Sequence, residues 1–437
     1  MIEESSRHNS TVGVPEKSAT YKMFWAAIML ISGTLTTLTA KVQFETKSEG
    51  LHSCNIDDDD NKNCPFTKPW FSVLEMKASM TICLFLYYVL GYGKEANIPD
   101  PTFTTIKAVW KPAILDLLNT VLGNIGLVWV NSSIYQMTRG SVVIFSALLS
   151  VKWLGRTLRH FHYWSIAFVT IAVIFVGTAG IEEKPPTDDD CVDDGDDGDD
   201  DTSSSGGEIL LGLFFILLAQ AVTAVQFIVE ESLMNDKATQ LSPVALVGFE
   251  GLWGVFYFAI LAPILTATPR SDLPISTLWH EDFLDSFTQI SNSSTLLYYV
   301  IAYCVAILAY NVSANTVTQC LSAVVRSILE ACRTMGVWVV GIILFYLGGT
   351  CGTKEIGEQW TNWSFLELFG FLVLLYGTFA YKALIKIPWV NEEQYKLAEK
   401  DNEVLTEASQ HNFDESEDKE AYSYSYLEGA EKDGIYK

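Results

Sequence analysis

The stretch Ile209–Val229, ILLGLFFILLAQAVTAVQFIV, decides the fold class, because its 21 residues include no charged side chain. Two further blocks of this kind are Leu117–Thr138 and Tyr163–Ile181. A helix that crosses a bilayer needs about 20 mostly apolar residues. Only helices and closed barrels satisfy all of their backbone hydrogen bonds in lipid, and blocks of this length are typical of helices. The sequence therefore predicts an all-α polytopic membrane protein.

Charge is concentrated in three polar segments outside these blocks. The 437 residues carry a formal net charge of −24, of which Asp57–Asp60 contributes −4, Asp188–Asp201 contributes −10 and the tail 391–437 contributes −9. The rest of the chain is close to neutral and strongly apolar. An acidic surface repels phosphate groups, so the composition argues against nucleic acid as a partner and favours the lipid bilayer.

We predict ten membrane-spanning helices. Their ranges are 22–41, 70–92, 108–130, 133–154, 162–181, 209–230, 243–267, 296–318, 323–347 and 364–385. No cleavable signal-peptide pattern precedes the first apolar run, so we expect it to be kept as a span. An even number of spans leaves both ends on one side. The density of Lys and Arg in the loops 93–107, 152–161 and 231–242 places that side in the cytosol.

The acidic segment after the fifth span divides the chain into two halves. The predicted parts are a cytosolic tail (1–20), a first five-helix repeat (21–181), an acidic luminal linker (182–208), a second five-helix repeat (209–387) and an acidic, disordered cytosolic tail (388–437). Arg139 and Gly155 have the same spacing of 16 as Arg333 and Gly349. Five spans per half is an odd number, so the second half must be inverted in the membrane. A 5+5 inverted repeat of ten helices is a common plan for secondary carriers, with the substrate site at the midplane.

Ionisable residues inside the spans are the candidate functional residues, because each costs at least about 2.5 kcal/mol to insert. Arg326, Glu330 and Arg333 lie four and then three residues apart, on one face of the ninth span. They predict either a charged stripe that lines a central cavity or a local ion-pair set that fixes packing. Asp116 and Arg139 are single charges within long apolar stretches, and Arg139 could pair with the acid of the ninth span.

Other polar residues in the spans extend this set, because amides there either hydrogen-bond neighbouring helices or contact a solute. The candidate substrate-binding residues are Asp116, Arg139, Gln226, Glu250, Asn311, Asn315, Arg326, Glu330 and Arg333. Glu230 and Glu231 end the sixth span, where a solvated helix end is as good an interpretation as a site. Lys41 ends the first span, where its ammonium group can reach the lipid headgroups.

The predicted luminal loops contain candidate modification sites. Four cysteines on this oxidising side could form two disulfides or remain free thiols, namely Cys54, Cys64, Cys191 and Cys351. Asn292 and Asn362 begin glycosylation sequons close to span starts. No Walker A, HExxH or zinc-binding pattern occurs, and the Asp run lacks the order of an EF-hand. The sequence therefore predicts neither an enzyme nor a bound cofactor or metal.

Four regions carry a resemblance to a known family. They are Tyr21–Lys41 (YKMFWAAIMLISGTLTTLTAK), Tyr135–Arg156 (YQMTRGSVVIFSALLSVKWLGR), Ala219–Glu231 (AQAVTAVQFIVEE) with Gly248–Gly254 (GFEGLWG), and Leu321–Trp338 (LSAVVRSILEACRTMGVW). The chain resembles the drug/metabolite transporter superfamily. It most closely resembles solute carrier family 35, subfamily F, in the member-six branch that is related to chloroquine-resistance-transporter-like proteins.

This resemblance covers most of residues 21–386 but neither tail nor the Asp-rich linker. It implies a 5+5 inverted repeat with a cavity formed by spans one to four and six to nine. It also implies that several of the charged residues stand at motif positions of the family. These are Arg139, Glu250, Arg326, Glu330 and Arg333.

We therefore expect a secondary active transporter or antiporter of a small organic solute in an endolysosomal membrane. Proton coupling through Glu250, Glu330 or Asp116 is an added hypothesis. Tyr424 and Leu427 match a pattern that endolysosomal sorting adaptors bind. Golgi and mitochondrial membranes are alternative locations. Two other functions stay open: a Golgi nucleotide-sugar exchanger, and a non-transporting scaffold that recruits partners through its acidic tail. The solute and the oligomeric state do not follow from the sequence.

Overall fold

The chain is an all-α polytopic membrane protein. The computed structural model describes residues 18–53, 62–94, 98, 100–127, 135, 138–154, 159–182, 206–235, 240–268, 279–347, 359–381, 383 and 385–397. Seven helices in this part of the chain are long and apolar enough to cross a membrane. They are Ala19–Glu45, Pro69–Tyr88, Leu210–Met234, Pro243–Ala267, Ser294–Cys320, Ala323–Leu347 and Ser364–Tyr381.

Each predicted range contains a helix. The elements are α1 (Ala19–Glu45), α2 (Pro69–Tyr88), α3 (Phe103–Ala108), α4 (Trp110–Leu127), the 3₁₀ turn η1 (Arg139–Ser141), α6 (Val142–Leu154), α7 (His160–Glu182), α8 (Gly206–Asn235), α9 (Pro243–Ala267), α11 (Phe283–Asn292), α12 (Ser294–Cys320), α13 (Ala323–Leu347) and α15 (Ser364–Tyr381). α9 begins at the predicted residue because Pro243 occupies its first turn and Ser242 accepts a hydrogen bond from the Ala245 amide.

Several predicted boundaries were wrong, because hydropathy marks the apolar stretch and not the end of the helix. α8 continues to Asn235 and buries Glu230 and Glu231, so a solvated helix end is the wrong interpretation of these two residues. Lys41 lies within α1, which runs on to Glu45.

Two further boundaries differ from the prediction. α3 occupies the end of the range predicted as the loop 93–107. α15 ends at Tyr381, before the predicted residue 385. Ala383 has a φ of 57°, which a right-handed helix cannot contain.

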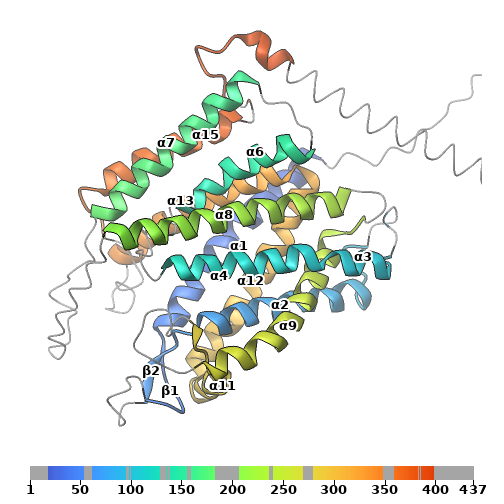
Figure 1. Cartoon of the computed structure of the whole chain (residues 1–437), viewed down its shortest axis with the longest axis vertical. Coiled ribbons are helices and arrows are strands. Elements are labelled where there is room, and N and C mark those ends of the chain that lie inside the picture. The colour runs from blue at the N-terminus through green and yellow to red at the C-terminus, as the bar shows by residue number, and fades with distance from the viewer. Residues whose placement is uncertain are drawn as a thin grey trace, which may run out of the picture.

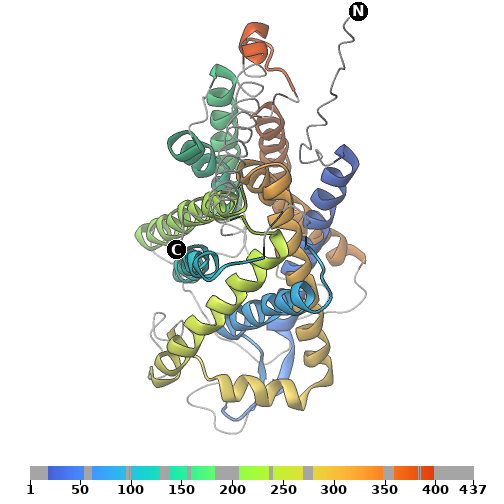
Figure 2. The ribbon, with the colours of Figure 1, turned by 90° about the vertical axis from the view of Figure 1, so that its right-hand side faces the viewer.

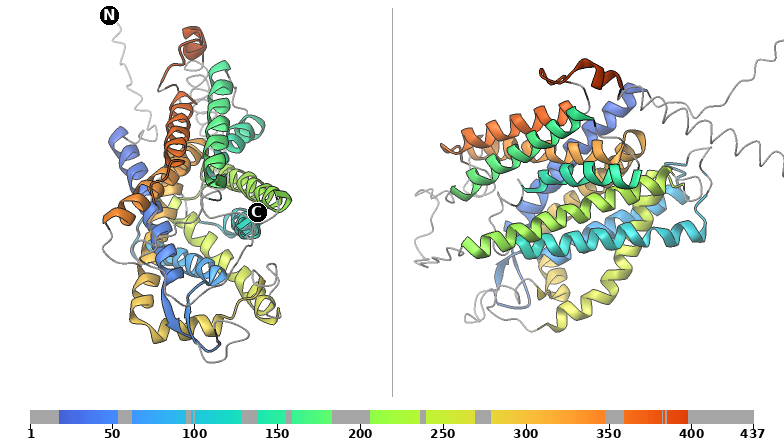
Figure 3. Two further views of the ribbon diagram at one scale, coloured as in Figure 1. Left: turned by 90° about the vertical axis from the view of Figure 1, so that its left-hand side faces the viewer. Right: turned by 45° about the horizontal axis from the view of Figure 1, so that its top comes forward.

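The helices pack in pairs that join the two halves of the chain. α1 packs on α12, α2 on α9, α4 on α8 and α7 on α15, while α6 contacts both α8 and α13. α7 and α15 lie side by side at one edge of the bundle, and α2 and α9 lie together towards the opposite edge (Figure 1). α4 and α8 run alongside each other (Figure 3). Each pair takes one helix from the first half and one from the second, so the core is built between the halves.

α2 and α9 approach so closely that only glycine fits between them. Gly248, Gly251 and Gly254 recur every third residue on the face of α9 that meets α2. A Cβ atom at Gly251 would lie 2.8 Å from the carbonyl oxygen of Lys77 and 2.8 Å from the amide nitrogen of Thr81. Small residues allow such close packing between membrane helices. This crossing sets Lys77 against the first half of α9.

Large apolar side chains cover the outside of the bundle. On α9, for example, Phe256, Ile260 and Ile264 are exposed at intervals of four residues, whereas Glu250 is buried. A water-soluble protein rarely exposes a continuous apolar surface of this kind. The outward apolar face and the inward carboxylate match a helix that is surrounded by lipid on one side and by protein on the other.

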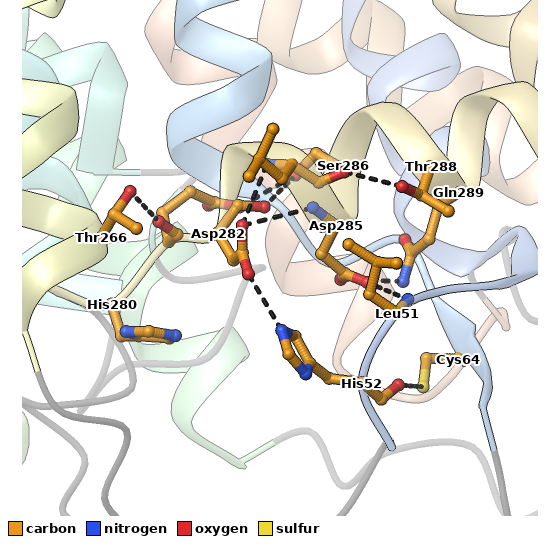
Figure 4. A network of polar contacts seen from close by, with 12 residues as sticks. Leu51, His52, Cys64, Thr266, His280, Asp282, Asp285, Ser286, Thr288 and Gln289 are labelled. Carbon is orange, nitrogen blue, oxygen red and sulfur yellow. Dashed lines mark hydrogen bonds and ion pairs between the residues drawn. The ribbon is translucent and has the colours of Figure 1, made fainter.

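A cap lies at one end of the bundle, made of a hairpin, α11 and residues 279–282. Its strands are β1 (Lys47–Glu49) and β2 (Asn63–Pro65), which pair antiparallel. The hairpin and α11 lie together at the bottom of the molecule (Figures 1 and 2). The Leu51 amide donates to Asp285 over 2.6 Å, and His52 Nε2 lies 3.0 Å from Asp282 (Figure 4). The cap therefore ties the loop after α1 to the loop after α9, and its two strands are an addition to the predicted all-helical fold.

Candidate functional site

Lys77 is a fully buried cation at the centre of the bundle. Its side chain is 1% exposed, and its Nζ lies 2.5 Å from Asp116 Oδ2 on α4 and 3.7 Å from Glu250 Oε1 on α9. A buried charge is tolerated only when opposite charges or hydrogen bonds compensate it. Lys77 therefore holds α2, α4 and α9 together through its two carboxylates.

Gln226 of α8 connects this group to a third carboxylate, that of Glu230. Its Nε2 donates to Glu230 Oε1 over 2.7 Å and to Glu250 Oε1 over 3.3 Å. Glu230 lies one turn further along α8 and is 0% exposed. The amide thus lies between two acidic groups that would otherwise repel each other.

Arg326 of α13 neutralises Glu230 at the other end. Its guanidinium donates to Glu230 and, over 3.2 Å, to Asn315 Oδ1 on α12. It also stacks over the ring of Phe227, with 4.0 Å between the guanidinium carbon and the ring centroid. We call this continuous set the central polar network. Its members are Asp116, Lys77, Glu250, Gln226, Glu230, Arg326 and Asn315.

A second group surrounds Glu330 on α13. Arg333 lies one turn further on, with 3.1 Å between its Nη2 and Glu330 Oε2. The hydroxyl of Tyr310 on α12 donates to the same carboxylate, and the Arg333 guanidinium lies 4.9 Å from the Tyr310 ring centroid. Arg139 of η1 interacts electrostatically with both Arg333 and Glu330. We call Tyr310, Glu330, Arg333 and Arg139 the Glu330 cluster.

The two groups share α13, whose charged face was predicted from its spacing. Arg326, Glu330 and Arg333 are all buried, so they face the interior of the bundle and not the lipid. Ser146 of α6 and Ser327 of α13 hydrogen-bond over 2.7 Å beside them. Span four and span nine therefore meet.

Eight of the nine predicted site residues belong to these two groups. Asn311 is the exception, because its Nδ2 donates to the Ile307 carbonyl of its own helix over 2.9 Å. The expected pairing of Arg139 with the acid of span nine also needs correction. Glu330 makes its ion pair with Arg333 on its own helix, and Arg139 acts on both from a distance.

Sequence reasoning missed Lys77, Glu75 and Gln43. The first two lie inside the predicted range 70–92, where ionisable residues are costly, so the signal was present. Gln43 lies beyond the predicted end of span one, but α1 continues past it and buries it completely. The Gln43 Nε2 donates to both carboxylate oxygens of Glu75, over 3.3 Å to Oε1 and over 3.0 Å to Oε2.

Two of the described candidate modification sites, Cys64 and Asn292, lie in the cap, and Asn362 lies just before α15. Cys64 is disulfide-bonded, whereas Cys54, Cys191 and Cys351 lie outside the described residues. The four span cysteines, namely Cys83, Cys304, Cys320 and Cys332, are not disulfide-bonded. Asn362 is exposed, and the exposed Asn292 donates from its side chain to the Glu49 carbonyl over 2.9 Å. Tyr424 and Leu427 lie outside the described residues.

No group of three or more His, Cys, Asp or Glu side chains could hold a metal ion in the part of the chain that the structure describes.

Glu281 in the cap has a pKa well above the ordinary value of a glutamate. Burial raises the pKa of Glu281 to about 7, although Lys68 and the hydroxyl of Ser286 oppose this shift. Burial would also raise the pKa of Asp282, but the amide of Asp285 and the imidazole of His52 lower it overall.

No family model matches the sequence. The chain is 30% identical to an uncharacterized protein of Schizosaccharomyces pombe over 373 residues. The aligned region covers 84% of this chain and 99% of that protein. It is 28% identical over 372 residues to solute carrier family 35 member F6 of Homo sapiens. This alignment covers 83% of this chain and 89% of the human protein. The corresponding Mus musculus protein is 26% identical over the same shares.

Proposed function

This chain belongs to solute carrier family 35, subfamily F, and from that premise we propose that it is a secondary active transporter or antiporter of a small organic solute. The proposal extends to an endolysosomal membrane and to coupling with protons. The helical membrane fold and the solute carrier relatives support transport of some solute. The proposed endolysosomal location rests on the sequence pattern of the tail, and the proposed proton coupling rests on the buried carboxylates.

The observation that carries the proposal is the central polar network. It joins α2 and α4 of the first half to α8, α9, α12 and α13 of the second half through buried charges. Structural packing alone does not require such costly groups, because apolar residues of similar volume stabilise a core as well or better. Ionisable residues within membrane helices usually mark the route of a solute or an ion.

The pairing of the helices supports a 5+5 inverted repeat. If each helix of one half is exchanged for the helix five spans further on, the pair α1–α12 becomes the pair α8–α4. The pairs α2–α9, α6–α13 and α7–α15 map onto themselves. A pseudo-two-fold axis between the halves has this property, and carriers of this plan bind their solute near that axis. The central polar network contains residues from four of these pairs, all except α7–α15.

The formal charges suggest which solutes to test first. Three carboxylates and two cations leave the central polar network one negative charge in excess, when all are ionised. In the Glu330 cluster two arginines face one glutamate, which leaves one positive charge in excess. A solute with both charges, such as an amino acid or a small peptide, would complement both groups. A nucleotide sugar carries negative charge alone and would complement only the second.

Counterflow with purified protein in proteoliposomes tests the proposal. Liposomes preloaded with amino acids and small peptides, or with nucleotide sugars, should take up the labelled form of the transported class. Arg326→Ala and Glu330→Ala should abolish that uptake at equal protein content. Lys386→Ala is the matched control, because its exposed partner is Glu392, 2.7 Å away, and it should transport normally.

Three outcomes would contradict the proposal or redirect it. Normal transport in Arg326→Ala and Glu330→Ala would remove the two charged groups from the route. Exchange of nucleotide sugars alone would favour the Golgi exchanger. Loss of cellular function on deletion of 391–437, with no effect of charge substitutions in the helices, would favour the scaffold.

A further inference from the structure

We propose that Glu75 of α2 is a proton-binding site, in which the neutral carboxylic acid pairs with the amide of Gln43 on α1. This site is separate from the central polar network and from the Glu330 cluster. It deepens the proposed function, because it names a group that would carry the coupled proton. Neither Asp116, Glu250 nor Glu330 suits that role as well, because each already contacts a buried cation.

Glu75 is buried without a counter-charge. Its side chain is 7% exposed, and Gln43 is 0% exposed. In the described residues its only polar contact is the Gln43 amide, at 3.0 Å and 3.3 Å from its two oxygens. An isolated carboxylate is very unfavourable in such surroundings and becomes neutral by taking up a proton.

The helices packed around Glu75 supply no positive charge to it. α12 contributes Tyr303 and Cys304, a phenol and a thiol. On α2 itself, Lys77 lies two residues further on and makes its contacts with Asp116 and Glu250 instead. On α1, Lys41 and Glu45 lie two residues to either side of Gln43, and residues two apart on a helix do not share a face.

The side-chain oxygen of Gln43 has no hydrogen-bond donor among the described residues, and a protonated Glu75 would provide one. Gln43 Oε1 is buried and has no hydrogen-bond partner among the described residues. Buried polar atoms are nearly always paired. A proton on one oxygen of Glu75 turns that oxygen into a donor for Gln43 Oε1, while Gln43 Nε2 keeps its bond to the other oxygen. The ionised carboxylate is an acceptor only, so protonation is the step that completes the pair.

The site lies towards the cap end of the bundle. Glu75 is in the second turn of α2, which starts at Pro69 beside the cap, and Gln43 is in the last turn of α1. Glu230 lies near the end of α8 and Arg326 lies in the first turn of α13. With the cap on the luminal side, as the distribution of basic residues predicts, Glu75 would be loaded with its proton from the lumen.

Infrared difference spectroscopy on the full-length protein in liposomes tests this site without knowledge of the solute. Spectra recorded between alkaline and acidic buffers contain a carbonyl-stretch band for each carboxyl group that takes up a proton. Glu75→Gln should remove one such band from the region of protonated carboxylic acids. Glu330→Gln is the matched control, because Glu330 is equally buried but paired with Arg333, and it should leave that band in place. A Glu75→Gln spectrum that matches the wild type would overturn the proposal.

Gln43→Leu provides a second measurement that a purely structural role would not affect. The band of Glu75 should remain but shift in frequency, because the acid loses its amide partner. An unshifted band would overturn the pairing even if Glu75→Gln failed to fold. The spectra report the proton on the protein, so they separate the two proposals. A protein that shows the Glu75 band but transports no solute would refute the proposed function alone.

Discussion

The central polar network and the cap both join segments that are far apart in the sequence, but their surroundings differ. In the network, Lys77, Glu230 and Arg326 are almost completely shielded from solvent. In the cap, the imidazole of His52 is 60% exposed where it meets Asp282. An exposed pair exchanges its contacts with water easily, whereas a buried pair leaves an uncompensated charge when it is broken. Each charge of the network therefore depends on its partner, whereas the exposed pair of His52 with Asp282 in the cap can be lost at little cost.

Lys77→Met should have the largest effect, because it leaves Asp116 and Glu250 without their shared cation. Removal of one partner of a buried ion pair costs about 3–5 kcal/mol. We expect a clear fall in the thermal unfolding midpoint of the detergent-solubilised protein. Lys94→Met is the control, because Lys94 and Asp100 form an exposed pair with 3.3 Å between Nζ and Oδ1. A Lys77→Met protein as stable as the wild type would show that the two acids do not need this cation.

Acidic pH should stabilise the cap through Glu281. Burial raises the pKa of Glu281 from the ordinary 4.5 to about 7, so the folded cap holds a proton that the unfolded chain releases between these values. Stability therefore increases as the pH falls from about 7 towards 4.5, by up to about 3 kcal/mol at roughly 1.4 kcal/mol per pKa unit. Thermal midpoints measured across this window should show the trend in the wild type and lose it in Glu281→Gln. A trend of equal size in the variant would assign it to another group.

Gly251→Ala should destabilise the crossing of α2 and α9. The added Cβ would lie 2.8 Å from backbone atoms of α2, which cannot move aside as a side chain can. Overpacking of this kind costs about 1–3 kcal/mol. Gly336→Ala is the matched control, because its Cβ would meet only the Thr34 hydroxyl, at 3.1 Å. Equal thermal midpoints for the two variants would contradict the close approach of the two helices.

His52→Ala should have the smallest effect, because its partner Asp282 and the imidazole are both accessible to water. Exposed ion pairs contribute about 0–1 kcal/mol. We expect a thermal midpoint close to that of the wild type, and limited proteolysis of the hairpin should be unchanged. A loss of stability comparable to that of Lys77→Met would show that the cap is as dependent on single charges as the network is.

The ranges of most helices along the chain could be predicted from the sequence, but which helices pack against one another could not. Residues 243–267 and 323–347 were predicted to the residue, because hydropathy and the capping residues are encoded locally. The charged face of α13 also followed from its spacing alone. The contact of Lys77 with Asp116 could not be predicted, because nothing in either segment states which helices become neighbours.

The sequence by itself determined that this is a helical membrane protein with costly charges inside its spans, since length, hydropathy and helical period are properties of each segment alone. Only the tertiary structure decided which charges neutralise one another. It pairs Lys77 with Asp116 and Glu250, and it leaves Glu75 with an amide instead of a cation. The physical reason is that electrostatic compensation in a medium of low dielectric constant depends on distances between helices, and the packing of glycine faces and apolar surfaces sets those distances.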